Sequence, residues 1–410
     1  MTLNYIWIGF FFIAFVVALC KFIFMGDTDV FTQIISSTFD SAKMGFEISI
    51  GLTGILSMWL GLMKIGEKAG LIQRFSRFAS PVFSKLFPEL PKNHPAAGSI
   101  FMNFSANILG LDNASTPIGL KAMQELQELN TQKEKASNSM IMFLCINASG
   151  LTIIPITIMM YRAQLNAANP ADVFLPILLT TAISTLVAII SVCLMQKINI
   201  LQKNLLLFFG GSMVFICSLM WLFQSMSQRQ VELYSTLFAN TLLFTIICGF
   251  IFCGFRKKLN VYETFIEGAK EGFNTAVKII PYLIAMFIAI AVFRSSGAMD
   301  MLVDGIRHVV VFCGFDPSFV EALPTMLMKP LSGNGSRVMM LDAMKTFGVD
   351  SFIGRLTCVA QGSVDTTFYI VALYFGSVAI KNTRYTIPCA LLADLTGSIT
   401  AIIIAYIFFF

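Results

Sequence analysis

The sequence predicts an all-α integral membrane protein built as an inverted-topology repeat. Composition is the first observation behind this fold class, since 56% of the 410 residues are hydrophobic and only 12% are charged. A soluble globular protein has about 25% charged residues. Long apolar runs are the second observation, because they approach or exceed the roughly 20 residues that a membrane helix needs. The third is a set of short polar motifs that occurs twice in the same order.

The apolar runs predict about nine transmembrane helices and two re-entrant hairpins. The first run lacks a basic segment before it and a small-residue cleavage site after it, so we interpret it as a retained helix and not as a signal peptide. The segments 95–112 and 317–333 are apolar but short and broken, which indicates hairpins covered by protein or by a water-filled cavity. The spans are expected at 4–24, 47–64, 138–161, 172–195, 204–223, 233–254, 279–294, 352–376 and 386–409.

Three motifs of the first half return in the second half. Their separations are 227, 221 and 214 residues, and this slow decrease is expected if the second copy has shorter loops. The pairs are AKMGF at 42–46 with AKEGF at 269–273, NAS at 113–115 with NGS at 334–336, and NASxxT at 147–152 with QGSxxT at 361–366.

Each copy is expected to have the same internal order. A full span is followed by an amphipathic surface segment (70–87 and 299–313) of the kind that lies in the membrane interface. A hairpin, a polar broken span and a final apolar span complete the copy. We therefore expect an N-terminal helix at 1–30, a first repeat at 40–195, connecting helices at 196–260 and a second repeat at 261–410.

Loop charges set the expected orientation. With the N-terminus in the cytoplasm, most lysines and arginines outside the spans fall in cytoplasmic loops, as the positive-inside rule requires. Five spans then separate the beginnings of the two copies, and because five is odd the copies enter the membrane in opposite directions. Many secondary transporters have this architecture. The expected location is the cytoplasmic or inner membrane, in contact with its lipids.

Polar side chains gather in the hairpins and the broken spans, where burial in a membrane is costly. A helix broken in mid-membrane exposes N–H groups at one end and carbonyl groups at the other. Amide side chains offer both donors and acceptors, which suits neutral polar solutes such as nucleosides, bases or amino-acid backbones. The candidate solute-binding residues are Asn103, Asn107, Asn113, Ser115, Asn147, Ser149, Asn334, Ser336, Gln361, Ser363 and Thr366.

Structural roles remain open for several of these residues. Asn113 and Asn334 each precede a predicted helix and can serve as N-caps, with the serine two positions later assisting. Asn147, Ser149 and Ser363 can join helices, because small polar side chains hydrogen-bond between membrane helices.

Three further residues are candidates for binding a coupling ion, either Na⁺ or H⁺: Asp112, Asp365 and Thr152. An acidic residue within a span is a functional candidate by default. The alternative for Asp365 is a structural pair with Arg337 or Arg355, and the alternative for Asp112 is a favourable charge at a helix N-terminus.

Other function classes are not expected. The chain contains neither H-E-x-x-H nor G-x-S-x-G and has no evident nucleophile–base pair, so an enzyme is not predicted. Its nine cysteines include no C-x-x-C pair, and it has only two histidines. We therefore expect no metal centre and no organic cofactor. No basic patch points to a nucleic-acid partner, whereas a homo-oligomer is compatible with the architecture.

A family resemblance rests on the polar segments. The run NFSANILGLDNASTPIGLKAMQ at 103–124 resembles spore maturation protein A, while PLSGNGSR at 330–337 and QGSVDTT at 361–367 resemble spore maturation protein B. The chain thus looks like a natural fusion of the two, with the joint near 196–232. This family carries the nucleoside recognition, or Gate, domain, which is similar to parts of concentrative nucleoside transporters and of ferrous iron transporters. The resemblance implies inverted repeats with hairpins and broken helices, but it does not fix the substrate.

The expected function is secondary transport of a small polar solute, nucleoside-like or amino-acid-like, by alternating access. Coupling to Na⁺ or H⁺ is part of this expectation. The alternative is a non-transporting membrane factor in envelope or spore maturation. If the four polar segments form one site, the turns at 113 and 334 should face each other near the membrane centre.

Overall fold

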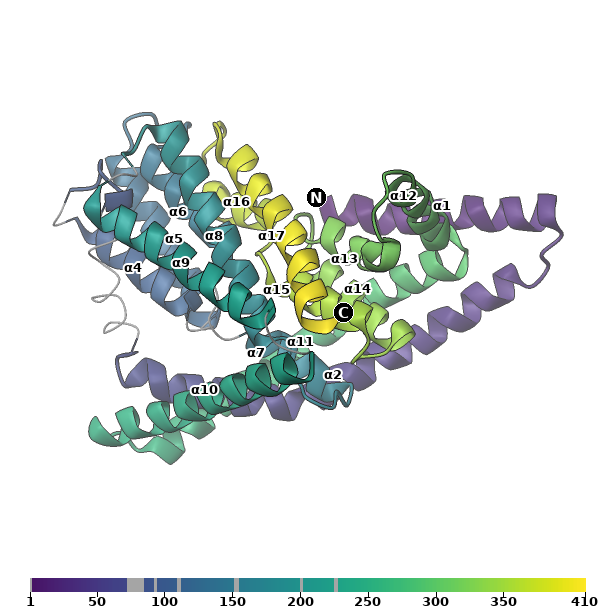
Figure 1. The fold of residues 1–410 in the computed structure, drawn as a ribbon, viewed down its shortest axis with the longest axis horizontal. Helices are drawn as coiled ribbons and strands as arrows, with labels where there is room; N and C mark the ends of the chain where they lie inside the picture. Colours follow the sequence, from purple (N-terminus) through teal and green to yellow (C-terminus); the bar gives the residue numbers. More distant parts are fainter. Residues whose placement is uncertain are drawn as a thin grey trace.

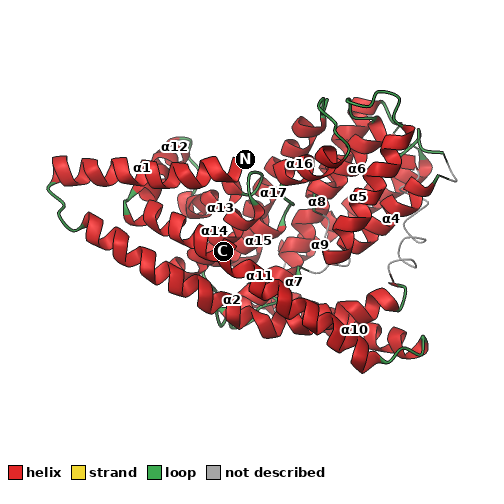
Figure 2. Cartoon of the chain, turned by 180° about the vertical axis from the view of Figure 1, so that it is seen from behind, coloured by secondary structure: helices red, strands yellow, loops and turns green. Residues whose placement is uncertain are grey.

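The computed structural model describes residues 2–71, 85–91, 94–108, 112–150, 155–199, 202–224 and 228–410. In these ranges the secondary structure is helical, and the only β pairing is an isolated bridge between Lys135 and Asn382 (Figures 1 and 2). The helices are α1 (Thr2–Met25), α2 (Val30–Lys68), α4 (Pro95–Ile108), α5 (Asp112–Leu129), α6 (Asn138–Ala148), α7 (Ile156–Gln164), α8 (Phe174–Gln196), α9 (Lys203–Gln224), α10 (Gln228–Arg256), α11 (Val261–Ser295), α12 (Ala298–Phe312), the 3₁₀ helix η1 (Pro317–Ala322), α13 (Leu323–Met328), α14 (Gly333–Phe347), α15 (Phe352–Gly362), α16 (Thr367–Ser377) and α17 (Thr386–Phe409).

The chain is an all-α, multi-pass membrane protein, as the sequence predicts. Within the described ranges, α1, α2, α8, the α15–α16 segment and α17 are each long and apolar enough to cross a membrane. The bent pair α11–α12, with an angle of 66°, adds a sixth candidate. A helix or a broken helix pair also occupies each of the nine predicted spans. Large exposed apolar side chains, among them Phe12 and Phe244, suit contact with lipid.

The equivalent helices α2 and α11 pack against each other along their length and run antiparallel (Figure 1). Gly45 of α2 lies against Ile284 of α11, and near the other end Gly272 of α11 lies against Ser57 of α2. Gly45 and Gly272 are counterparts at the 227-residue separation, as are Ser57 and Ile284. The two contacts are therefore related by an internal two-fold axis, which is the geometry of an inverted repeat.

Small residues at every fourth position let α2 and α11 approach closely. The α2 face carries Gly45, Ser49, Thr53, Ser57 and Gly61, and the facing α11 stripe carries Thr264, Gly268, Gly272 and Ala276. Such small-xxx-small faces allow backbone contact between membrane helices. The helices are longer than the spans predicted at 47–64 and 279–294, since α2 has 39 residues and α11 has 35.

Helices α1 and α10 occupy matching positions on this pair. Helix α1 packs on α11, where Phe10 and Phe293 have ring centroids 4.8 Å apart. Helix α10 packs on α2, where Phe250 lies against Gly66. Gly66 is the counterpart of Phe293 at the 227-residue separation. In the second copy α10 thus takes the place that α1 takes in the first.

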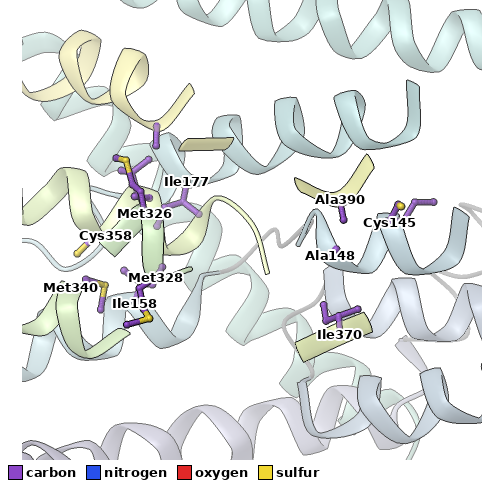
Figure 3. Close-up of a cluster of buried hydrophobic side chains, with 14 of the residues drawn as sticks. Cys145, Ala148, Ile158, Ile177, Met326, Met328, Met340, Cys358, Ile370 and Ala390 are labelled. Atoms are coloured by element: carbon purple, nitrogen blue, oxygen red, sulfur yellow. The ribbon is translucent and has the colours of Figure 1, made fainter. Parts of the chain in front are cut away.

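The second halves of the two broken spans exchange partners. Helix α7 of the first copy packs beside α15, and α16 of the second copy packs beside α5 and α6. In Figure 3, Ile158 of α7 accordingly lies among methionines of the second copy, whereas Ile370 lies near Ala148 of the first. This exchange buries apolar surface between the copies and brings the two breaks to the middle of the molecule.

The segments predicted as hairpins, 95–112 and 317–333, each form only the first arm of a packed helix pair, and the second arms are the helices that follow, α5 and α14. Helices α4 and α5 lie side by side, with their turn outside the described residues. In the second copy, η1 and α13 pack on α14. The predicted surface segment at 299–313 corresponds to α12, while most of its partner at 70–87 lies outside the described residues.

Candidate functional site

The breaks of the two interrupted spans touch each other at the internal two-fold axis. The amide N–H of Asp365 donates to the carbonyl of Ala148 over 2.9 Å. Gly150, with φ of +66°, lies so close that a Cβ atom there would be 2.7 Å from the Asp365 nitrogen and 2.8 Å from the carbonyl carbon of Val364. Gly150 and Val364 are counterparts at the 214-residue separation. The axis that relates the copies therefore passes through this contact.

A pocket of about 160 Å³ opens beside the joined breaks. Residues of both copies line it: the first break and α7 supply one wall, and the α13–α14 connection with the second break supplies the other. Its polar and charged lining residues are Thr157, Tyr161, Lys329, Arg337, Gln361 and Asp365.

Three charged side chains give this pocket its electrostatic character. Arg337 places its guanidinium carbon 5.8 Å from the centre of the Tyr161 ring, within the range of a cation–π contact. Lys329 follows α13 and is largely buried. Asp365 is exposed at the break, and one of its carboxylate oxygens accepts a 2.7 Å hydrogen bond from the Thr366 amide. Two cations and one carboxylate thus face a common space.

The charges belong to the second copy alone. At the separations that relate the copies, Lys329 corresponds to Ile108, Arg337 to Thr116 and Asp365 to Leu151. The repeated scaffold therefore does not require these charges, which makes them candidates for a solute site.

Predicted site residues of the second copy support the pocket wall. The Ser336 hydroxyl lies 2.5 Å from Oε1 of Gln361 and 2.7 Å from the Thr325 carbonyl oxygen. Gln361 also directs its Nε2 toward the Gly333 carbonyl at 3.4 Å, and its side chain reaches the pocket. Thr366 is buried beside Gly333. These hydrogen bonds join α14 to α15, and the Gln361 amide lies at the pocket surface.

The N-cap of α14 is Ser332, not Asn334. The Ser332 hydroxyl accepts the Gly335 amide N–H over 3.0 Å. Asn334 lies in the first helical turn with an exposed side chain, and its Oδ1 is 3.5 Å from a guanidinium nitrogen of Arg337. The alternative role of Asn334 as a cap is therefore wrong, because the capping position falls two residues earlier.

The predicted site residues of the first copy bond to one another and to backbone carbonyl groups. Asn103, fully buried, donates to the Ser115 carbonyl over 2.7 Å. Asn107 donates to Oδ1 of Asn147 over 2.7 Å, and Asn147 donates to the Phe143 carbonyl over 2.8 Å. These bonds fasten α4 to α5 and to α6, which fits the helix-joining role that the sequence left open.

The two serines at the breaks make local contacts. Ser149 donates to the Ile146 carbonyl over 2.7 Å and lies 3.0 Å from the Thr185 hydroxyl of α8. Ser363 donates to the Ala360 carbonyl over 2.7 Å. Both side chains are fully buried, and neither is among the residues that line the pocket.

The remaining predicted residues lie at or beyond the edge of the described structure. Thr152 is outside the described residues, and Asp112 and Asn113 begin α5 with side chains that are not described. Helices α5 and α14, which follow the two hairpin turns, lie on opposite sides of α15 and α17 (Figures 1 and 2). The two breaks meet at the centre of the molecule.

Sequence comparisons report the same repeat. The Gate family model, described as nucleoside recognition, matches residues 49–164 and 276–381. The chain belongs to the Gate family. The two matched segments begin 227 residues apart, which is the separation found between the α2 and α11 motifs.

Two curated relatives of this Gate protein are spore maturation proteins from Bacillus subtilis (strain 168). Spore maturation protein A is 42% identical over 187 residues, covering 46% of this chain and 92% of the relative. Spore maturation protein B is 44% identical over 164 residues, covering 40% of this chain and 90% of the relative. No solved structure matches the chain. These similarities confirm the predicted resemblance to both spore maturation proteins.

Sequence reasoning missed three side chains near the centre of the Gate protein. Lys329 falls within the predicted hairpin at 317–333 but is not among the candidate residues, although it lines the pocket. Tyr161 belongs to none of the repeated polar motifs, so the sequence did not mark it as a candidate. Asp394 lies within the apolar run of α17, and the rule that singled out Asp365 as an acid in a span also applies to it. In the described part of the chain, no group of three or more His, Cys, Asp or Glu residues could hold a metal ion.

Proposed function

We propose that this Gate protein is a secondary transporter of a small polar solute. The observation that carries the proposal is the charged pocket at the contact between the two breaks, with walls from both inverted copies. Transporters with inverted repeats bind solute at the repeat interface, next to broken helices, and expose the site by moving one repeat against the other. A pocket at the axis is placed for such alternating access.

The pocket favours an amino-acid-like solute over a nucleoside-like one. Lys329 and Arg337 provide two cationic donors for a carboxylate, and Asp365 provides an acceptor for an ammonium group. The volume of about 160 Å³ also suits a small molecule, because a cavity of about 150 Å³ holds benzene. A nucleoside is larger and brings no negative charge for the two cations.

Arg337→Gln is expected to weaken binding of the transported solute about 10- to 150-fold. A hydrogen bond to a charged group contributes about 1.5–3 kcal/mol, and each 1.4 kcal/mol is a tenfold change in affinity. The measurement is uptake into proteoliposomes by purified protein, with pools of labelled amino acids and nucleosides. Arg337→Lys keeps the charge and should retain part of the activity. Arg307→Gln, at the α12–η1 ion pair outside the pocket, is the matched control.

The names of the relatives favour a second candidate function, a non-transporting membrane factor in envelope or spore maturation. This factor would need a stable protein partner and would tolerate changes in the pocket. If wild-type protein moves no solute under any ion gradient while Arg337→Gln cells behave as wild type, transport is rejected. Co-purification of one partner in native lipid particles would then support the second function.

We infer a cytoplasmic or inner membrane location with the N-terminus inside, supported by the loop charges. The α7–α8 loop is then outside and the α5–α6 loop inside. A cysteine at Ala168 should react with an impermeant reagent in intact cells, whereas one at Thr131 should react only after permeabilisation. Both positions are exposed in the structure. The reversed reactivity would contradict this orientation.

A further inference from the structure

Helix α17 carries a buried carboxylate that the proposed solute site does not use. Asp394 is only 3% exposed, and neither carboxylate oxygen has a hydrogen-bond partner in the described part of the chain. The residue lies in an otherwise apolar helix that is long enough to span the membrane. An isolated ionised carboxylate at such a place costs several kcal/mol in solvation, so a group of this kind is neutralised or paired.

Asp394 lies beside the second break. Gly397, one turn further along α17, is so close to the break that a Cβ atom there would be 2.7 Å from Cγ1 of Val364 and 3.3 Å from the Ser363 hydroxyl. The fully buried Thr367 hydroxyl lies beside the Asp394 carboxylate and interacts with it, although the pair does not reach ordinary hydrogen-bond geometry. A carboxylate and a hydroxyl thus meet, without a well-formed hydrogen bond, where α17 touches the broken span.

The charged neighbours of Asp394 are pocket residues. Lys329 and Asp365 both act on it electrostatically. Three of the helices that pack on α17, namely α6, α8 and α16, carry cysteine or tyrosine side chains but no charged side chain. Cys145 of α6 interacts electrostatically with the Asp394 carboxylate. Helix α15 contributes only Arg355, which is engaged in an ion pair of its own, and α9 and α10 carry charges only near their ends. Lys329 is therefore the cation that Asp394 shares with the solute pocket.

We propose that Asp394 binds the coupling proton and that Lys329 links its protonation to solute in the pocket. This inference rests on the proposed transport function. When the pocket is empty, the ammonium group of Lys329 offsets the charge of Asp394. A solute carboxylate in the pocket competes for the same ammonium group, and Asp394 then takes a proton from water to become a neutral acid. Solute and proton thus favour each other's binding, and the coupling is reciprocal.

A proton fits this site better than a sodium ion. The ammonium group of Lys329 acts on the same carboxylate, so a metal cation bound there would be repelled. A proton removes the negative charge and leaves an O–H donor, for which the Thr367 hydroxyl is an adjacent acceptor.

Infrared difference spectroscopy tests the protonation site without any need for transport. The wild-type protein should show the carbonyl stretch of a protonated carboxylic acid that grows as pH falls. Asp394→Asn should lack this band, and Asp316→Asn, at an exposed acid bonded to Ser318, should keep it. If wild type and Asp394→Asn give the same spectra at every pH, or if the band responds to Na⁺ and not to pH, the proposal is overturned.

Proteoliposomes test the coupling. An inward proton gradient should raise solute accumulation at least tenfold in wild type, whereas Asp394→Asn should exchange labelled for unlabelled solute without responding to the gradient. Accumulation by Asp394→Asn that still follows the proton gradient, or wild-type accumulation that follows Na⁺ alone, would overturn the inference. If wild type neither exchanges nor accumulates any solute, the transport function fails, and the infrared titration still decides whether Asp394 is a proton site.

Discussion

Replacement of Arg162 by methionine is expected to lower the free energy of unfolding by about 3–5 kcal/mol, because it removes the counter-charge of buried carboxylates. The Arg162 side chain, at the end of α7, is fully buried. Its guanidinium lies 2.8 Å from the Asp172 carboxylate and 2.9 Å from that of Asp350, and it donates to the Val349 carbonyl over 2.8 Å. Methionine keeps an apolar side chain in the space but satisfies neither carboxylate.

This ion network joins the two copies at one end of the molecule. Arg355 of the second copy donates to the other Asp172 oxygen over 2.7 Å, and the Ala168 amide of the first copy donates to Asp350 over 2.9 Å. At the related end, the exposed Lys381–Glu134 pair spans the corresponding loops. Exposed ion pairs contribute little to stability because water and salt screen them. Backbone hydrogen bonds, such as that from Ala136 to the Asn382 carbonyl, also cross the related end. The two ends therefore differ in that, among the described residues, only the first is joined by a buried ion network.

The measurement is the unfolding midpoint of purified protein in a mild detergent, followed by circular dichroism. Lys381→Met is the matched control and should change the midpoint little. In Arg162→Met/Asp350→Asn, part of the lost stability should return, since one unpaired charge is removed. An Arg162→Met midpoint no lower than that of Lys381→Met would show that the network does not hold the two copies together.

The helices and their repetition could be predicted from the sequence, but the helix ends could not. Helix α2 begins at Val30, well before the predicted span at 47, because charged residues such as Lys43 and Glu47 reduce the hydropathy of the segment around them. In the structure these two side chains are exposed, 3.9 Å apart, one turn from each other on the helix surface. A helix can continue through charges that face away from its packing partner, and hydropathy alone does not reveal this.

Part of the lining of the central pocket could be predicted from the sequence. Gln361 and Asp365 do line a pocket, because a polar, interrupted span marks a break wherever it occurs. The assignment of Asn107 and Asn147 to the same site did not anticipate that they bond to each other. Which polar residues pair and which face a cavity depends on how α7 and α16 exchange between copies. That exchange is a property of tertiary packing and leaves no local sequence signal.

Gly268→Ala is the second substitution for which a large effect is expected, because α11 touches the α2 backbone at this glycine. A Cβ atom there would lie 2.3 Å from the Leu60 carbonyl oxygen, 2.6 Å from Cβ of Lys64 and 2.9 Å from Cα of Gly61. Backbone atoms cannot move aside as a side chain can, so the two helices must separate. Overpacking of this kind costs about 1–3 kcal/mol and sometimes more.

No loss of stability is expected for Gly249→Ala in α10, where no atom of the described residues beyond the local helix backbone lies within 4 Å of the added methyl group. Alanine favours a helix over glycine by about 1 kcal/mol, so this control should be neutral or stabilising. Thermal unfolding in detergent compares the two variants. Disulfide cross-linking between introduced cysteines at Gly45 and Ile284, which touch near the far end of the pair, then reports whether α2 and α11 still meet. Equal stability and equal cross-linking in both variants would mean that the α2–α11 contact does not require its small residues, and the close antiparallel packing of the two copies would have to be abandoned.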